Sequence, residues 1–224
     1  MDFEFLTKIK VFKGIDAEDL EKLFDWLGYE IRRYSKGDII LMAGDKVSSM
    51  GIVLTGSANI ESNDVWGNKS IFDNVVSGQV FAEVYACAND EELMVDVVAN
   101  ESCEIVFLKM SKIFDSEDYT AHYQDRFASN LLKIMSLKNL NLSRKIYHVS
   151  SKSIRGRIVS YLSYLSRKLE SKIIEIPYNR QQLSDYLCVD RSALSNELSK
   201  MQREGLIKYN KNKFEIISEY DFEI

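Results

Sequence analysis

The chain has 224 residues, of which 46% are hydrophobic and 28% charged, and its formal net charge is -5. These proportions are those of an ordinary globular protein and exclude a disordered or fibrous chain. No apolar run approaches the roughly 18 residues of a membrane-spanning helix, and the start at Met1 lacks the basic and apolar regions of a secretory leader. We therefore expect a cytoplasmic protein of two modest domains with no membrane contact.

The first predicted element is a short amphipathic helix over residues 17–27. Its apolar side chains Leu20, Leu23, Phe24 and Leu27 recur at i, i+3, i+4 and i+7. This spacing puts all four on one helical face, which predicts a helix that packs against a core.

From Tyr29 to about Met110 the pattern changes to short β-branched and aromatic runs. The clearest runs are residues 38–41, 51–54, 69–72 and 103–108. Glycines punctuate them at Gly37, Gly44, Gly56, Gly67 and Gly78. Short strands separated by glycine turns predict a compact antiparallel sandwich or barrel.

Residues 117–147 contain neither proline nor glycine, which favours one long helix. Its apolar side chains are Phe127, Leu131, Ile134, Met135, Leu142 and Ile146. About thirty helical residues span about 45 Å, so we expect this helix to bridge two domains and pair with its copy in a second chain. Asn130 or Lys138 could set the register of such a pair. The alternative is a helix buried within one chain.

The charge is divided unevenly along the chain. Residues 1–144 hold 15 Lys and Arg against 24 Asp and Glu, residues 145–213 hold 14 against 6, and residues 214–224 hold 0 against 4. The basic stretch would attract a polyanion. A solvated lysine-rich surface is the alternative that charge alone leaves open.

The basic stretch begins with a predicted helix over residues 153–169 and a short strand over residues 173–176, which Pro177 ends. The apolar stripe of that helix is Ile154, Ile158, Leu162 and Leu165. A capping residue then opens a short helix at Asn179, with Gln182 three places on and Leu183 and Leu187 on one face.

The chain breaks at Cys188 and Val189, and Asp190 caps a second helix that stops at Gly205. Its inward face carries Leu194, Leu198 and Met201. Two helices joined by a three-residue turn form a helix-turn-helix. Residues 206–209 and 214–217 then predict a hairpin wing with lysines at its tip. Any helix pair of a small α domain could share this spacing, but the wing and the local charge favour a DNA-binding unit.

The exposed N-terminal face of the second helix predicts the contacts to bases. Arginine can donate two hydrogen bonds to guanine, asparagine can pair with adenine, and serine is adaptable. The predicted base contacts are Arg191, Ser192, Ser195 and Asn196. The predicted contacts to the DNA backbone are Asn179, Arg180, Lys200, Arg203, Lys211 and Lys213.

Several blocks, in this order along one chain, resemble the cyclic-AMP receptor protein/FNR superfamily. The N-terminal blocks are Lys36-Gly37-Asp38-Ile39-Ile40, Gly44, Thr55-Gly56-Ser57 and Ser77-Gly78-Gln79-Val80-Phe81-Ala82-Glu83. The C-terminal blocks are Ser153-Ile154-Arg155-Gly156-Arg157-Ile158, Asn179-Arg180-Gln181-Gln182-Leu183 and Asp190-Arg191-Ser192-Ala193-Leu194-Ser195-Asn196-Glu197-Leu198.

The resemblance implies an α+β fold with an effector-binding double-stranded β-roll over residues 1–115, a dimerisation helix over 116–147 and a winged helix-turn-helix over 148–224. It implies a homodimeric transcription regulator and no enzyme. Such a dimer would bind a near-palindromic operator in double-stranded DNA, with half-sites about one helical turn apart. RNA polymerase would be a further partner of an activator.

Departures from the superfamily bear on the signal that the protein detects. Members that bind cyclic nucleotides hold the phosphate with an Arg-Ser pair, where this chain has Leu93 and Met94, so we do not expect cyclic AMP. The N-terminal cysteines of the oxygen-sensing members are missing, and Cys87, Cys103 and Cys188 form no CxxC pair. We therefore expect three unbridged thiols and no iron–sulfur cluster.

Haem is not expected either, because the only histidines, His122 and His148, are interpreted as helix-surface residues. Cys188 stands where the turn of such proteins often carries glycine. Glu83 is interpreted as a carboxylate that orients a loop.

An unidentified small-molecule effector would lie between the β-roll and the long helix. The predicted pocket residues are Glu83, Tyr85, Cys87, Leu93, Met94, Phe127, Asn130 and Leu131. They favour a hydrophobic or aromatic ligand, but they would equally suit a core without ligand. Two alternatives therefore stay open. One is a constitutive DNA binder with a vestigial sensor domain, and the other is a ligand-binding or protein-interaction module that does not recognise DNA.

Overall fold

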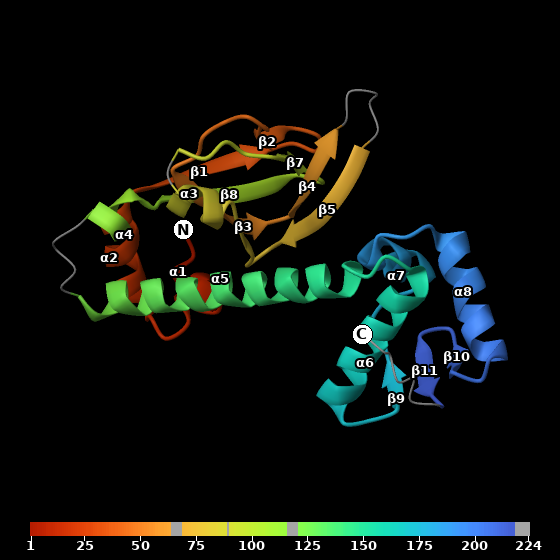
Figure 1. Ribbon diagram of the computed structural model, residues 1–224. Coiled ribbons are helices and arrows are strands. Elements are labelled where there is room, and N and C mark those ends of the chain that lie inside the picture. The colour runs from red at the N-terminus through yellow and green to blue at the C-terminus, as the bar shows by residue number, and fades with distance from the viewer. Residues whose placement is uncertain (64–68, 89, 116–120, 218–224) are drawn as a thin grey trace. The chain divides into compact units, whose positions relative to one another are not determined.

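The computed structural model describes residues 1–63, 69–88, 90–115 and 121–217. The chain divides into two compact units, Met1–Ser136 and Leu137–Ile224. Figure 1 shows the elements of both units, and each unit is described by itself.

The first unit opens with three helical elements. These are α1 (Phe3–Leu6), the 3-10 helix η1 (Lys10–Phe12) and α2 (Ala17–Leu27). The helix predicted over residues 17–27 is confirmed at both ends. The side chain of Asp16 accepts a hydrogen bond from the backbone N–H of Asp19 at 2.9 Å, which satisfies a free amide of the first turn.

In the described residues, eight strands form two four-stranded antiparallel sheets, as expected for a β-roll (Figure 1). The first sheet has the order β1 (Tyr29–Tyr34), β8 (Cys103–Lys109), β3 (Ser49–Thr55) and β6 (Val80–Phe81). The second has the order β2 (Ile39–Leu41), β7 (Asp96–Ala99), β4 (Ser57–Asn63) and β5 (Lys69–Val76). The four runs predicted from the sequence lie in β2, β3, β5 and β8.

Two glycines of the roll have no room for a side chain. A Cβ at Gly51 would lie 2.1 Å from the Phe81 ring, and one at Gly56 would lie 2.4 Å from the carbonyl oxygen of Ser102. Gly56 also has a positive φ of 76°, which only glycine adopts without strain. Gly67, one of the predicted turn glycines, lies outside the described residues.

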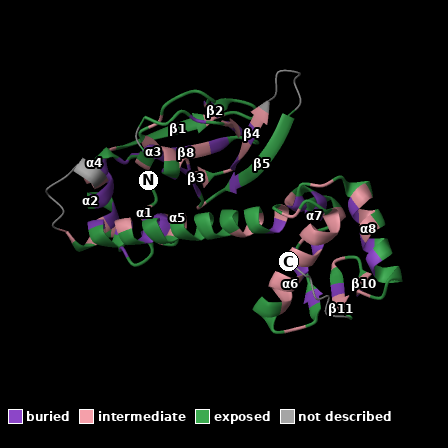
Figure 2. Ribbon diagram, in the orientation of Figure 1, coloured by how far each residue is buried: buried purple, intermediate pink, exposed green. Residues whose placement is uncertain are grey.

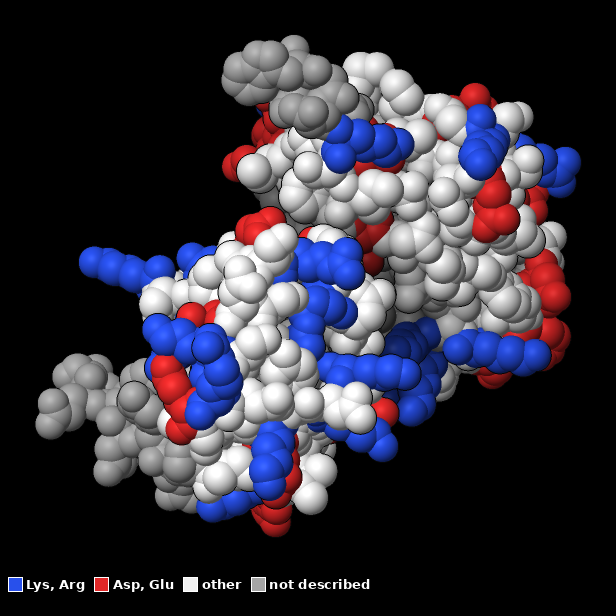
Figure 3. All heavy atoms as spheres, turned by 90° about the vertical axis from the view of Figure 1, so that its right-hand side faces the viewer, with Lys and Arg blue, Asp and Glu red and all other residues white. Residues whose placement is uncertain are grey.

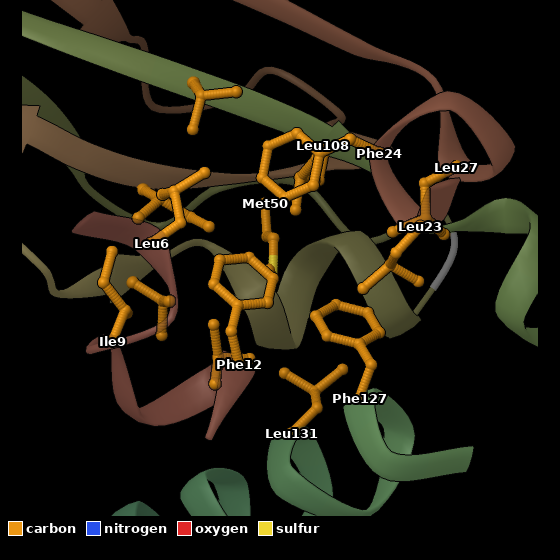
Figure 4. Packing of buried hydrophobic residues seen from close by; sticks show 14 of the residues in the cluster. Leu6, Ile9, Phe12, Leu23, Phe24, Leu27, Met50, Leu108, Phe127 and Leu131 are labelled. Atoms are coloured by element: carbon orange, nitrogen blue, oxygen red, sulfur yellow. The ribbon is translucent and has the colours of Figure 1, made fainter. Parts of the chain in front are cut away.

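Among its described residues, two apolar clusters stabilise the first unit. One lies within the roll and includes Val53, Phe81 and Ile105. The other joins the N-terminal helical elements to β3, β8 and the long helix, and Figure 4 shows Phe12, Phe127 and Leu131 within it. The rings of Phe12 and Phe127 stack with centroids 5.7 Å apart. The burial colours of Figure 2 show buried residues where the N-terminal helices meet this helix.

The predicted long helix is found as α5 (His122–Val149), and residues 116–120 lie outside the described part. Asn130 does not have the register-setting role suggested for it. Its Nδ2 donates to the carbonyl oxygens of Val11 at 3.1 Å and Lys13 at 2.8 Å within the same chain. A buried amide must find such partners, and here they are nearby backbone groups. Two further helices, α3 (Glu83–Ala88) and α4 (Ser111–Asp115), did not follow from the hydrophobic pattern.

After the end of α5, the described residues of the second unit form three helices and a small sheet. The helices are α6 (Ile154–Leu169), α7 (Arg180–Leu187) and α8 (Arg191–Arg203). The strands are β9 (Ile173–Glu175), β10 (Ile207–Asn210) and β11 (Lys213–Ile216), in the order β10-β11-β9. Their apolar faces meet in one cluster that includes Ile158, Leu183, Leu198 and Phe214. The predicted order of helix, strand, helix pair and wing is confirmed.

None of the described helices is long and apolar enough to cross a membrane. The same part of the chain holds no group of three or more His, Cys, Asp or Glu side chains that could bind a metal ion. Cys87, Cys103 and Cys188 are unbridged.

Candidate nucleic-acid interface

The first helix of the pair, α7, begins at a complete capping box. The side chain of Asn179 accepts from the backbone N–H of Gln182 at 2.9 Å, and the side chain of Gln182 accepts from the backbone N–H of Asn179 at 2.9 Å. Leu183 and Leu187 are buried on its inner face. Two reciprocal hydrogen bonds fix where the helix starts, so the sequence signal was sufficient here.

The turn between the helices depends on an arginine whose role the sequence did not reveal. Cys188 adopts the left-handed conformation, with φ 52° and ψ 53°, at the position where glycine is common. Nη1 of Arg157 on α6 donates to the carbonyl oxygens of Leu187 at 3.0 Å and Cys188 at 2.8 Å. Its Nε donates to the carbonyl oxygen of Ser151 at 2.9 Å. Arg157 therefore ties α6, and the segment before it, to the turn.

The second helix, α8, is oriented by its cap and its apolar face. Asp190 accepts from the backbone N–H of Ala193 at 2.8 Å, and Leu194, Leu198 and Met201 are buried. The opposite face then points to solvent. Arg191, Ser192 and Asn196 are exposed, and Ser195 is half-buried. The structure thus brings the four predicted base contacts together at the N-terminal end of α8.

Two serines, Ser195 and Ser199, follow one another along the same face of α8 toward the wing. The hydroxyl of Ser195 donates to the carbonyl oxygen of Arg191 at 2.9 Å, and that of Ser199 donates to the carbonyl oxygen of Ser195 at 2.9 Å. Ser199 Oγ also lies 3.2 Å from the hydroxyl of Tyr209 in β10. Ser199 was not predicted, although its spacing of four from Ser195 puts it on the same face.

Arg155 on α6 pairs with one acidic residue of α8, Glu197, and with Glu204, which directly follows the helix. Nε of Arg155 lies 2.5 Å from Oε1 of Glu197, and its Nη1 lies 2.7 Å from Oε2 of Glu204. The hydrogen bond from Arg155 lowers the pKa of Glu204. Lys200 and Arg203 remain exposed on the same helix. The pairing therefore favours a net positive charge on the exposed part of α8.

The wing follows α8 directly. β10 and β11 pair through residues 207–210 and 213–216, and Lys211 at the tip has a φ of 54°. Lys213 Nζ lies 3.6 Å from Oε2 of Glu175, an exposed pair that leaves the lysine accessible. The tip thus carries the two lysines that the sequence predicted there.

Arg180, another predicted backbone contact, is packed against the wing. Its guanidinium lies 5.0 Å from the centroid of the Tyr209 ring and 6.0 Å from that of Phe214. Its Nη2 donates to the carbonyl oxygen of Lys211 at 3.4 Å. Burial lowers the pKa of Arg180. These contacts join α7 to the wing, so this cation also has a structural role.

Figure 3 shows Lys and Arg side chains gathered over the second unit in this view. The predicted backbone contacts that are exposed in the second unit are Asn179, Lys200, Arg203, Lys211 and Lys213. A surface with these cations beside the polar end of α8 has the charge and shape to bind nucleic acid.

Neither of the two hollows found among the described residues is lined by the predicted effector residues. Phe127 and Leu131 are buried in the apolar cluster with Phe12, and Cys87 packs against it. Burial is the main cause that raises the pKa of the Cys87 thiol. These three side chains are thus brought together as a filled core.

The remaining predicted pocket residues differ in solvent exposure. Glu83 and Leu93 are buried, whereas Met94 is 81% exposed. The hydroxyl of Tyr85 accepts from the backbone N–H of Met94 at 3.5 Å. A hollow of about 180 Å³ does exist on this unit, but its lining includes Arg32 and Phe107, which were not predicted.

The interpretation of His148 as a helix-surface residue is wrong. His148 is buried, and its Nδ1 lies 3.0 Å from Oγ of Ser160. The rings of Tyr161, Tyr164 and Tyr186 surround it at 5.3 to 6.3 Å. This burial lowers the pKa of His148. Its neighbours come from α6 and α7, so the helical pattern of α5 alone could not reveal it. His122 is exposed, as expected.

Two family models match the chain in consecutive parts. A model of the cyclic nucleotide-binding domain matches residues 31–115, and one of the Crp-like helix-turn-helix domain matches residues 156–220. Together they cover about two thirds of the chain. The first lies on the β-roll and the second on the helix pair and wing.

Two curated transcription regulators match this chain over most of their own length. The transcriptional activator protein FnrL of Cereibacter sphaeroides is 21% identical over 215 residues, which are 92% of this chain and 82% of that protein. The cAMP-activated global transcriptional regulator CRP of Haemophilus influenzae is 20% identical over 204 residues, covering 86% of this chain and 87% of that protein. Both are transcription regulators and neither is an enzyme.

A solved structure has the same fold. The c-di-GMP-responsive global regulator CLP of Xanthomonas campestris superposes with a TM-score of 0.53 at 19% sequence identity. The match covers 91% of this chain and all of that one.

Proposed function

Since this chain belongs to the Crp/Fnr superfamily of transcription regulators, we propose that it is a cytoplasmic homodimer that binds a near-palindromic operator. Each copy would place α8 in the major groove of one half-site. The single observation that carries this proposal is the exposed polar end of α8, beside a lysine-tipped wing.

Base recognition is assigned to the four side chains at that end. Arg191 can donate two hydrogen bonds to guanine, and Asn196 can pair with adenine. Both side chains are exposed, so they can reach a base edge without leaving a core. Ser192 and Ser195 would complete the set, with the Ser195 hydroxyl exchanging its bond to the Arg191 carbonyl for one to DNA.

Contacts to the phosphates are assigned to the ends of the helices and to the wing. Lys200, Arg203, Lys211 and Lys213 would position the protein without selecting a sequence. Asn179 stands at the N-terminus of α7, where free amides and the helix dipole favour a phosphate. Arg180 would contribute mainly by holding the wing in place.

Dimerisation is assigned to α5. Its large exposed apolar side chains are Leu132, Leu137, Leu140, Leu142, Ile146 and Tyr147. So many apolar side chains on one helix favour a protein partner, and a second copy of α5 is the partner that a two-fold operator requires. With Asn130 held by its own chain, Lys138 is the remaining candidate for the polar residue that sets the register.

The signal is proposed to be a small-molecule effector other than cyclic AMP. Leu93 and Met94 stand where cyclic-nucleotide binders of the superfamily have an Arg-Ser pair, and neither can bind a phosphate. The closely packed cluster around Phe127 favours a second candidate, a constitutive DNA binder whose roll has only a structural role. RNA polymerase would be a further partner if the protein is an activator, as FnrL is named.

The experiment is selection of bound fragments from genomic DNA by purified protein, followed by titration of the recovered site at several salt concentrations. A two-fold site whose affinity falls steeply with salt supports the proposal. Equal affinity for all fragments would overturn the assignment of α8. Mass spectrometry of the denatured preparation, and comparison of affinity before and after adding cell extract, separates an effector-dependent protein from a constitutive one.

A further inference from the structure

The last turn of α5 carries a buried histidine that the DNA-binding proposal does not use. His148 is only 1% exposed. Its Nδ1 lies 3.0 Å from Oγ of Ser160 on α6, whereas its Nε2 is buried and has no hydrogen-bond partner among the described residues. A buried polar atom without a partner is uncommon in a folded protein and calls for an explanation.

Three tyrosines from two other helices form a cage around the imidazole, which we call the tyrosine cage. The ring centroids of Tyr161 and Tyr164 on α6 lie 5.5 Å and 5.3 Å from that of His148, and that of Tyr186 on α7 lies 6.3 Å away. Tyr147, the preceding residue on α5, has its ring 5.7 Å from the imidazole. The imidazole therefore joins the end of α5 both to α6 and to the first helix of the helix pair.

The charged groups beside the tyrosine cage are cations of α5. The guanidinium of Arg144 lies 5.7 Å from the ring centroid of Tyr164, and Nζ of Lys145 lies 6.0 Å from that of Tyr186. Tyrosine faces attract cations, but these two rings already have one each. A proton on His148 would add a third positive charge to the same place, and like charges repel.

The neutral and the charged ring differ in what they require. Whichever tautomer the neutral ring adopts, the charged ring has an N–H at both nitrogens, so Nε2 would become a buried donor with no acceptor. The dipole of α5 favours a cation in its last turn. Burial opposes this effect and lowers the pKa of His148. The closed cage therefore fits the neutral ring and not the charged one.

We propose that His148 is a pH-sensitive latch between the end of α5 and helices α6 and α7. The neutral ring keeps the last turn of α5 packed against the tyrosine cage. A ring that takes a proton from solvent leaves the cage for water, and the last turn of α5 is released with it. The core around Leu194 and Leu198 does not contain this ring, so it stays folded. The latch needs no DNA and is independent of the proposed function.

The test measures hydrogen exchange along the full chain, without DNA, at about pH 7.5 and about pH 5.5, on either side of the ordinary histidine pKa. After correction for the intrinsic exchange rate at each pH, the protection of amides 146–149 should fall by up to about tenfold at the lower pH. The protection of α8 should not fall. The imidazole signal of His148, followed by nuclear magnetic resonance, should titrate below the ordinary pKa.

Variants of the two histidines assign the effect. His148→Phe keeps a ring in the cage that cannot take a proton, so the pH dependence of amides 146–149 should disappear. His122→Asn is the matched control, because His122 is exposed and is the only other histidine of the chain. It should leave the pH dependence in place, and the imidazole signal that it retains is that of His148.

A second pair of variants tests the hydrogen bond within the latch. Ser160→Ala removes the partner of Nδ1 and should lower the protection of amides 146–149 at both pH values. Ser163→Ala, on the same helix but in the lining of the hollow of the second unit, should not. Unchanged signals of Leu194 and Leu198 establish that each variant is folded.

Three results overturn the proposal. One is a His148 signal that titrates at or above the ordinary pKa while the end of α5 stays protected, because the cage would then accept the charged ring. Another is an equal loss of protection at low pH in His148→Phe, which would assign the effect to other groups. The third is a loss of protection that is uniform over α6, α7 and α8, which would mean that the whole unit unfolds and no separate latch exists.

Discussion

Polar side chains are exposed on α8 but buried in the predicted effector region of the first unit. On α8, Arg191, Ser192 and Asn196 are exposed. In the first unit, Asn130 is buried and both of its donated bonds go to backbone carbonyls. A side chain without internal partners is available to an external one, whereas a satisfied buried side chain stabilises the fold. The polar side chains of α8 are therefore available to bind DNA, whereas Asn130 has its hydrogen-bond partners within its own chain.

The largest expected effect on stability comes from creating a cavity in the apolar cluster around Phe127. Phe127→Ala should destabilise the first unit by about 3–5 kcal/mol, because it leaves a cavity beside Phe12. Chemical denaturation followed by the signals of each unit measures this loss. Ser129→Ala, at an exposed position of the same helix, is the control. A loss as small as that of the control would mean that the cluster around Phe127 is loosely packed and able to admit a ligand.

A second prediction concerns the turn that presents α8. Arg157→Ala should cost about 2 kcal/mol, since hydrogen bonds from a charged donor to the carbonyls of Leu187 and Cys188 are lost. Affinity should fall alike for operator and unrelated DNA, because the whole helix pair is loosened. Lys152→Ala, exposed and outside the turn, should do neither. Reduced discrimination without reduced stability would contradict this role.

The third prediction distinguishes sequence-specific contacts to bases from electrostatic contacts to phosphates. Arg191→Ala should lower discrimination at one base pair by about 1–3 kcal/mol and leave protein stability unchanged. Lys200→Ala should instead weaken binding to every sequence and reduce the slope of log affinity against log salt by about one. Titrations of matched and mismatched sites at several salt concentrations measure both. If the Arg191 variant kept full discrimination, the assignment of that side chain to a base would fail.

The smallest effect is expected from pH. Burial lowers the pKa of His148, so the folded state favours the neutral ring and the unfolded chain binds the proton more readily. The stability that this group contributes is complete above its ordinary pKa near 6.5 and is lost as the pH falls below it. The titratable groups beside the ring are tyrosines of α6 and α7. Arg144 and Lys145 on α5 lie over two of these tyrosines, Tyr164 and Tyr186.

The measurement is the unfolding midpoint of the second unit between about pH 7.5 and 5.5, a range centred on the ordinary histidine pKa. His148→Asn should flatten the dependence, and His122→Asn, at an exposed position, should leave it in place. An equal fall in both variants would assign the pH dependence to other groups.

The features that followed from the sequence are local ones. The boundary of α2, the capping box of α7, the cap of α8 and the wing each depend on residues a few places apart, so short patterns contain the information. The features that did not follow depend on distant parts of the chain. Asn130 meets Val11 across 119 residues, and Arg157 meets Leu187 across 30. No spacing rule connects such pairs, because the tertiary packing alone brings them together.

The exposed face of α8 has a consequence for how the protein can diverge. Since Arg191, Ser192 and Asn196 contribute little to the core, their replacement costs the fold little. The caps, the buried leucines and the Arg157 bonds are under a separate constraint, that of keeping the helix in place. A gene duplicate could therefore acquire a new operator through a few substitutions while inheriting its architecture intact.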